Sequence, residues 1–337
     1  IFLSSLAWSE YDQVERSPYQ SMDAWTEAWA LEMIRTEDPI TLSSYFIEQK
    51  IPFEPSDVHH AINLLLHITA AILLLKNLEA LKLSAAFPVA LIFALHPTAL
   101  QTIFWSGYRE EIIGLILILA ALYFGIQNRN SRDFLMHTMI CVIAYISHPA
   151  TLVIPLLLGL CIFYKNGSSS FKDYNRLLPL LCLALFIGVW TQGGSTIVEL
   201  EFGERLGISA QNFFFYLKQA LFPFEKALFY PFYQSKGFSL GVQNSFLPIL
   251  LLIPFYILIV MNLRKTWARG LLLGLTAYLL LIFYGISQVG TFIDGSLALE
   301  DNLQYVALPT IVALFICTLD GITRIMGLRS IVLSRLV

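Results

Sequence analysis

The side chains that could do chemistry in this chain stand at the ends of long apolar runs. His59 and His60 open one run, Arg109 opens another, and His96 and His148 each precede a proline that closes a run. Ionisable groups are costly within reach of a bilayer, where they usually face a cavity or a polar partner. Of these, we take His60, His96, Arg109 and His148 as candidate site residues.

Carboxylates hold comparable positions next to the apolar runs. Glu10 and Asp12 follow the first apolar segment directly, and Asp301 precedes the last one. As single residues, Glu10 and Asp12 could simply be solvated loop acids. The stronger signal is that acids, histidines and an arginine collect at one face of the membrane.

Several of these groups also have a simpler structural interpretation. Asn63 and His67 lie four residues apart on a predicted helix and could only form hydrogen bonds between helices. Arg109 could pair with Glu110 or Glu111 at the membrane interface. Each His-Pro pair could do no more than end a helix, since proline cannot continue the helical hydrogen bonds.

The four cysteines give no sign of a metal or redox site. All of them lie inside apolar runs and none forms a CxxC pair, so we expect small buried side chains. A divalent metal near the external acids is compatible with the residues there, but no ligand spacing requires one. Nucleic-acid binding has no support because no external basic stripe exists.

The elements that position these residues must be membrane helices. Of the 337 residues, 57% are apolar and 13% are charged, whereas soluble domains carry about 25% charged residues. A helix needs about 20 mostly apolar residues to cross a bilayer. Nine such windows occur, at 58–76, 83–105, 108–126, 134–148, 149–164, 177–191, 246–263, 270–288 and 304–322.

Residues 1–8 resemble the end of a tenth span, and because the chain begins at Ile1 we expect an upstream segment. The predicted fold is an all-α polytopic membrane bundle of about ten spans in one domain, 1–337. Two external segments, 9–57 and 191–244, are too long for simple turns. They hold three predicted amphipathic or aromatic helices, at 21–34, 40–49 and 209–222.

The distribution of charge predicts the orientation. Thirteen of the 21 basic residues fall in alternate short loops, at Lys76, Lys82, Arg129, Arg132, Lys165, Lys172, Arg176, Arg264, Lys265, Arg269, Arg324, Arg329 and Arg335. Because basic loops stay in the cytoplasm, we expect a cytoplasmic C-terminus and external acidic loops. A bacterial inner membrane with a periplasmic acidic side is the expected location.

The order of several short motifs resembles a known family. DVHHAINLLLH at 57–67, ALHP at 94–97, IFWSGYR at 103–109 and SHPA at 147–150 are similar to motifs of the membrane domain of tetratricopeptide-linked O-mannosyltransferases. YLK at 216–218, FYP at 229–231 and DNLQY at 301–305 continue the resemblance. These enzymes belong to the GT-C class of glycosyltransferases, so the resemblance implies a GT-C-like fold.

The resemblance also implies roles for the candidate residues. A polyprenyl-phosphate-linked sugar would bind at the outer membrane face, where a loop carboxylate, Glu10 or Asp12, would deprotonate the acceptor hydroxyl. The donor phosphate and its cavity would be contacted by five residues: His60, His96, Arg109, His148 and Asp301. Of these, His148 stands where the family has a lysine.

Four positions depart from the family pattern. Ser9-Glu10 replaces an acidic pair, Asp38-Pro39 replaces Arg-Pro, Gln101 replaces a glutamate, and Asn302 replaces an arginine. An amide cannot match a guanidinium on phosphate, because it lacks the charge and the paired donors. These losses indicate an eroded site.

Three functions therefore stay open from sequence. The first is an enzyme that transfers a sugar from a lipid phosphate. The second is a catalytically eroded homologue that acts as a structural or assembly subunit and binds membrane lipid or other membrane proteins. A transporter is a weaker third hypothesis, because the acids lie outside the membrane and not at its midplane.

Overall fold

The computed structural model describes residues 38–48, 50–52, 55–127, 130–167, 174–191, 202–223, 230–231, 247–287, 292–293, 296–299 and 301–326. The elements in chain order are α4 (Pro39–Glu48), α5 (Pro55–Ala80), α6 (Ala86–Ala94), α7 (Ala99–Phe104), η2 (Ser106–Tyr108), α8 (Arg109–Gln127), α9 (Ser131–Ser147), η3 (Pro149–Val153), α10 (Ile154–Asn166), α12 (Leu178–Thr191), α13 (Phe202–Leu221), β1 (Tyr230–Pro231), α15 (Leu247–Met261), α16 (Thr266–Ser287), β2 (Phe292–Ile293), β3 (Ser296–Leu299), η5 (Asp301–Gln304) and α17 (Leu308–Ile325).

All nine predicted apolar windows form helices. Within the described ranges, four stretches are long and apolar enough to cross a bilayer, namely Asp57–Ala80, Arg109–Gln127, Pro149–Asn166 and Thr266–Tyr284. Leu178–Thr191 and Leu252–Met261 are apolar but shorter. The helical architecture therefore fits an integral membrane protein, as expected, while the count of about ten spans stays a prediction.

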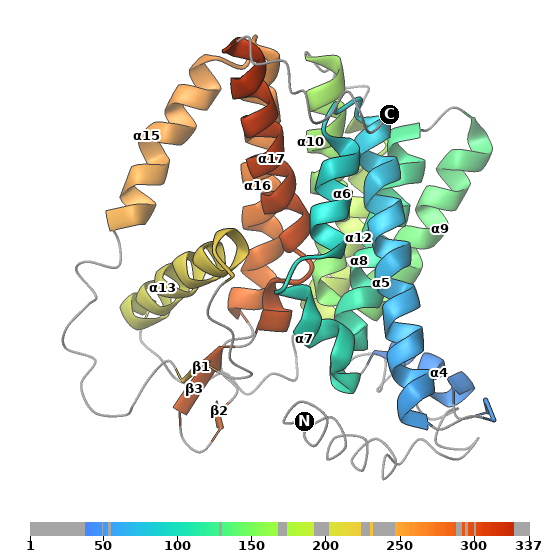
Figure 1. Cartoon of the computed structure of the whole chain (residues 1–337). Coiled ribbons are helices and arrows are strands. Elements are labelled where there is room, and N and C mark those ends of the chain that lie inside the picture. Colours follow the sequence, from blue (N-terminus) through green and yellow to red (C-terminus); the bar gives the residue numbers. More distant parts are fainter. Residues whose placement is uncertain are drawn as a thin grey trace.

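The helices form a bundle with one outlying arm (Figure 1). Helix α8 packs between α5 and α9, and α16 packs against α17 and α10. Helix α15 leans away from the bundle, and α13 lies across it at a steep tilt (Figure 1). Small residues allow close approach in the core, where Ala121, Cys141 and Ala144 are fully buried. Cys182 corrects the cysteine prediction, because its side chain is exposed.

Both His-Pro pairs end a helix, as one interpretation predicted. Helix α6 ends just before His96, and α9 ends just before His148. In each case the imidazole Nδ1 accepts a hydrogen bond from the amide two residues on, at 3.3 Å from Thr98 and 3.2 Å from Ala150. The predicted span 83–105 is therefore two short helices with a break between them.

The external segments are described only in part. The predicted helix at 40–49 is confirmed as α4, and the predicted aromatic helix at 209–222 lies within α13. The predicted helix at 21–34 lies outside the described residues, as does the partial first span. Strands β1, β3 and β2 add a small antiparallel sheet in that order, beside α13 in Figure 1.

Candidate functional site

Arg109 is the centre of a buried polar cluster. It is the first residue of α8 and is 0% exposed. Its Nε donates to Asn63 Oδ1 at 2.7 Å, and its Nη1 donates to Ser44 Oγ at 3.1 Å. Nη1 also forms an ion pair of 2.5 Å with Glu48 Oε2, and Nη2 lies 2.9 Å from His59 Nδ1. Three helices, α4, α5 and α8, thus meet at one guanidinium.

His59 Nδ1 has two competing partners. It lies 2.9 Å from Glu48 Oε1, which can only accept, and 2.9 Å from Arg109 Nη2, which can only donate. The tautomer of His59 therefore decides which contact is a hydrogen bond. His59 Nε2 is buried and has no hydrogen-bond partner among the described residues. This nitrogen is the atom of the cluster that is left for a ligand.

Tyr45 covers this cluster from α4. Its ring stacks on the His59 ring at 5.5 Å and lies 4.4 Å from the Arg109 guanidinium carbon. Burial raises the pKa of the Tyr45 hydroxyl, so the phenol stays neutral. Burial would also raise the pKa of Glu48, but the hydrogen bonds and charges of His59 and Arg109 lower it overall. Glu48 is therefore a carboxylate.

A second buried polar pair follows along α8. His148 Nε2 lies 3.3 Å from Glu111 Oε2, and both side chains are buried. The edge of the His148 ring meets Tyr284 of α16 at 4.8 Å. A Cβ atom built on Gly114 would lie 2.7 Å from the imidazole, so only glycine leaves room for it. Glycine at this position of α8 is what admits His148.

Asp38 connects the start of α4 to the end of α9. Its Oδ1 accepts from the amides of Ile40 and Thr41 at 3.0 and 3.2 Å, which is the geometry of a helix N-cap for α4. Ser147 Oγ, at the end of α9, also donates to it at 3.3 Å. Burial raises the pKa of Asp38, although its hydrogen bonds with Thr41 oppose the rise.

Of the remaining predicted residues, His96 lies apart from this cluster and His60 borders it. His96 Nε2 contacts the carbonyl oxygen of Ala220 at 3.0 Å and so joins the break after α6 to α13. His60 is half-buried, and its ring centroid lies 6.2 Å from that of His59 and 6.0 Å from that of Phe104. Asp301 opens η5. Glu10 and Asp12 lie outside the described residues.

Some simpler interpretations are correct. His67 contacts the Tyr305 hydroxyl at 2.7 Å and the Ala94 carbonyl at 3.2 Å, and Asn63 donates to the Ile103 carbonyl. These are hydrogen bonds between helices, as expected. The ion pair of Arg109 differs from the prediction. Arg109 pairs with Glu48 of α4 and not with a neighbouring glutamate on α8.

The sequence alone did not identify Glu48 or Ser44 as site residues. It also did not show that His59 contacts Arg109. A signal for Glu48 did exist, since a buried arginine needs a carboxylate and Glu48 ends the predicted helix at 40–49. Among the described residues, no group of three or more histidine, cysteine or acidic side chains could hold a metal ion.

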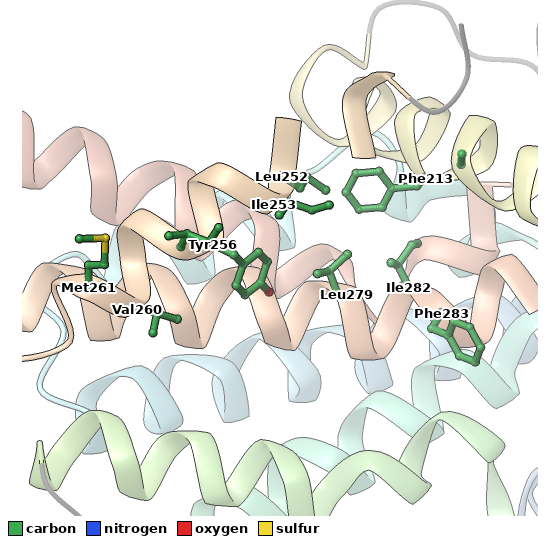
Figure 2. A pocket seen from close by; sticks show the side chains of 11 residues that line it. Phe213, Leu252, Ile253, Tyr256, Val260, Met261, Leu279, Ile282 and Phe283 are labelled. Carbon is green, nitrogen blue, oxygen red and sulfur yellow. The ribbon is translucent and has the colours of Figure 1, made fainter. Parts of the chain in front are cut away.

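An apolar groove runs between α13, α15 and α16. It has a volume of about 600 Å³. Figure 2 shows side chains of α15, from Leu252 to Met261, facing Leu279 and Ile282 of α16, with Phe213 of α13 at one end. Tyr256 is the polar exception, and its hydroxyl bonds to Thr276 at 3.0 Å. Such a groove suits a hydrocarbon chain.

Comparison with known proteins finds a sequence similarity to a glycosyltransferase. The chain is 22% identical over 161 residues to a protein O-mannosyl-transferase of Caenorhabditis elegans. This match covers 46% of the chain but only 23% of the relative, so it spans about a quarter of the relative's length. The similarity indicates a distant glycosyltransferase-like relationship.

No family model matches the chain, and no solved structure matches it.

Proposed function

We propose that this chain is a membrane glycosyltransferase of the GT-C kind. It would transfer a sugar such as mannose from a polyprenyl phosphate to a hydroxyl group of a protein. The carrying observation is the buried cluster around Arg109, next to the Glu111–His148 pair at the same end of the bundle. Buried charges are expensive to keep without a role. The similarity to a protein O-mannosyl-transferase supports the choice of reaction.

In the proposed step, the bond between the sugar C1 and the donor phosphate oxygen breaks, and a bond from C1 to the acceptor oxygen forms. Glu10 or Asp12 takes the acceptor proton, and polyprenyl phosphate leaves as the anion. The prenyl chain would lie in the groove between α15 and α16, and His59 Nε2 would meet a polar group of the donor. The site end of the bundle would face the periplasm.

A second function is favoured by a specific observation. Nε, Nη1 and Nη2 of Arg109 all have protein partners, so the guanidinium is already engaged. An arginine used this way ties α4, α5 and α8 together and does not clamp a phosphate. On that basis the chain would be an eroded homologue that serves as a structural subunit of a larger membrane complex.

Sugar transfer separates the two functions. The purified chain in liposomes is given polyprenyl-phosphate mannose labelled in the sugar and a peptide rich in serine and threonine. We expect label in the peptide, with a loss of about a hundredfold or more in rate for Glu10→Gln or Asp12→Asn. Glu79→Gln is the control, since Glu79 pairs with Lys76 at the other end of α5.

Absence of transfer by the parent protein, together with its isolation in a larger assembly, would overturn the enzyme proposal in favour of the structural one. Equal rates for the parent and both acid variants would refute the choice of base.

A further inference from the structure

A second cavity has its polar end, at Asp320 and Arg324, at the opposite end of the bundle from the Arg109 cluster, and it reaches along α8 as far as Leu115. It has a volume of about 510 Å³ and is lined from α5, α8, α10, α16 and α17. Pockets for small ligands usually measure about 300–1,000 Å³. Asn77 lines it near the end of α5, eighteen residues beyond His59. At 1.5 Å per helical residue, Asn77 and His59 are about 27 Å apart along α5.

The walls of this cavity are apolar. Leucine, isoleucine and alanine side chains of five helices contribute most of the lining, including Leu78, Leu115, Leu122, Leu157, Ala277 and Ala313. Water gains little in such a space, whereas CH₂ groups are favoured there. The interior therefore fits a hydrocarbon chain.

The polar side chains of the lining include a cluster near the C-terminal end of α17. Ser84 Oγ donates to Asp320 Oδ2 at 2.6 Å, and Arg324 Nη2 lies 3.1 Å from the same oxygen. Trp267, at the start of α16, also lines the cavity and is 48% exposed. Tryptophan and arginine at the end of an apolar cavity are typical of a membrane interface. The cavity is thus apolar inside and polar at its mouth.

Asn77 adds an unmet hydrogen bond inside the cavity lining. It is 5% exposed, and its Nδ2 donates to the carbonyls of Leu73 and Leu119 at 2.8 and 2.9 Å. Its Oδ1 is buried and accepts no hydrogen bond from the residues described here. An unmet buried acceptor is unfavourable, and a hydroxyl on a bound molecule would satisfy it.

Charge at this end indicates the sign of the headgroup. The negative charge of Asp320 is balanced by Arg324. Lys82 follows α5, and Arg264 and Lys265 precede α16, at the same end of the bundle. Basic groups near a bilayer surface attract anionic lipids. A phosphate-bearing headgroup is therefore the complementary one.

We propose that this cavity binds one hydrocarbon chain of an anionic phospholipid, with the phosphate beside Arg324. The site is independent of the proposed function, because its polar end lies at the other end of the molecule and the site needs no sugar donor. A structural lipid here fills the space between α5 and α8 on one side and α16 and α17 on the other.

The first test fills the cavity. A Cβ atom on Gly270 would touch only the Tyr164 ring, at 3.6 Å, so a leucine there reaches into the open space. The full chain in detergent is incubated with phosphatidylglycerol, and bound lipid is measured by native mass spectrometry. We expect one lipid per parent chain and at least about a tenfold weaker affinity, near 1.4 kcal/mol, for Gly270→Leu.

Gly159→Leu is the matched control. Its Cβ atom would also lie 3.6 Å from a tyrosine ring, that of Tyr174, but Gly159 does not line the cavity. This variant should bind phosphatidylglycerol like the parent. Equal binding by the two leucine variants would overturn the proposal.

The second test changes the mouth and does not depend on packing. Arg324→Gln should weaken phosphatidylglycerol binding by at least about threefold, while binding of diacylglycerol, which lacks the phosphate, stays unchanged. Arg132→Gln, at an exposed position that does not line the cavity, should change neither. An unchanged phosphatidylglycerol affinity in Arg324→Gln, or a second protein chain in place of lipid, would refute the assignment.

Discussion

Arg109 and Glu48 form an ion pair that almost no water reaches, with exposed fractions of 0% and 8%. Removing two charges from water costs more than their attraction returns unless further hydrogen bonds complete the geometry. Asn63, Ser44 and His59 supply those bonds. The energetic importance of the cluster therefore lies in its completeness, and loss of one partner leaves a buried charge behind.

Glu48→Gln should destabilise the protein by about 3–5 kcal/mol, because it leaves the Arg109 guanidinium without a counter-charge. The free energy of unfolding in mixed micelles measures this effect. Glu79→Gln, which removes a half-exposed pair with Lys76, should cost no more than about 1 kcal/mol. A Glu48→Gln variant as stable as the Glu79→Gln variant would contradict this prediction.

Asp38 and Glu48 should give stability opposite dependences on pH. The pKa of Glu48 is lowered in the fold, so its contribution is present above its ordinary pKa of 4.5 and is lost as the pH falls through the folded value. The pKa of Asp38 is raised above 3.8, so the fold favours its protonated form and loses stability as the pH rises through the folded value.

Asp38→Asn tests this difference, because asparagine keeps the N-cap of α4 without the charge. At neutral pH the variant should be at least as stable as the parent, and the loss of stability as the pH rises through the raised pKa of Asp38 should disappear. Unfolding curves at stepped pH values provide the measurement. A variant that keeps the slope of the parent would show that another group is responsible.

Individual residues of the cluster were only partly predictable. Arg109, His148 and His60 stand out in the sequence because charged groups are rare beside apolar runs. Their partners do not, since Glu48 is one of many acids in an external segment. Which acid meets which cation depends on how α4 docks on α5 and α8, and periodicity carries no information on docking.

At the scale of elements, Gly114 fixes how α8 and the end of α9 approach each other. Gly114→Ala should lower the melting temperature by several degrees, because the new methyl group would lie 2.7 Å from the His148 ring. Gly321→Ala on α17 meets nothing within 4 Å and should be neutral or slightly stabilising. Thermal unfolding of both variants checks the pair, and a harmless Gly114→Ala would disprove the steric argument.

The positions of most helices follow from the sequence, because long apolar runs and their prolines define them. His-Pro at 96–97 was recognised as a stop, yet the second short helix beyond it, α7, was not. The sheet was not predicted either. Its strands have two to four residues, and β1 pairs with β3 across more than sixty residues of chain.

For the whole molecule, the charge asymmetry predicts which end meets the cytoplasm. Lys50→Cys, near α4, should react with a membrane-impermeant maleimide in intact cells. Ser131→Cys, at the start of α9 beside the basic loop, should react only after the membrane is permeabilised. The parent protein is the control for its own cysteines. Labelling of Ser131→Cys in intact cells would reverse the proposed orientation.

The similarity to a glycosyltransferase does not extend the prediction to the whole molecule, since it covers less than half of the chain. The predicted bases, Glu10 and Asp12, also lie outside the described residues. Within the described part, the structure brings Arg109 together with His59 and pairs His148 with Glu111. It does not gather His96 into the same cluster, because that imidazole contacts α13.

The hydrogen bonds of the two His-Pro breaks limit what their imidazoles can do. Because Nδ1 of His96 and of His148 receives a backbone amide, the mobile hydrogen of each neutral ring must sit on Nε2. Neither ring can then accept a further proton or bind a cation through Nδ1 without breaking this hydrogen bond to the backbone. His60 Nδ1 carries no such bond. At the end of the bundle that holds the Arg109 cluster, any relay through histidine would therefore have to pass by way of α5.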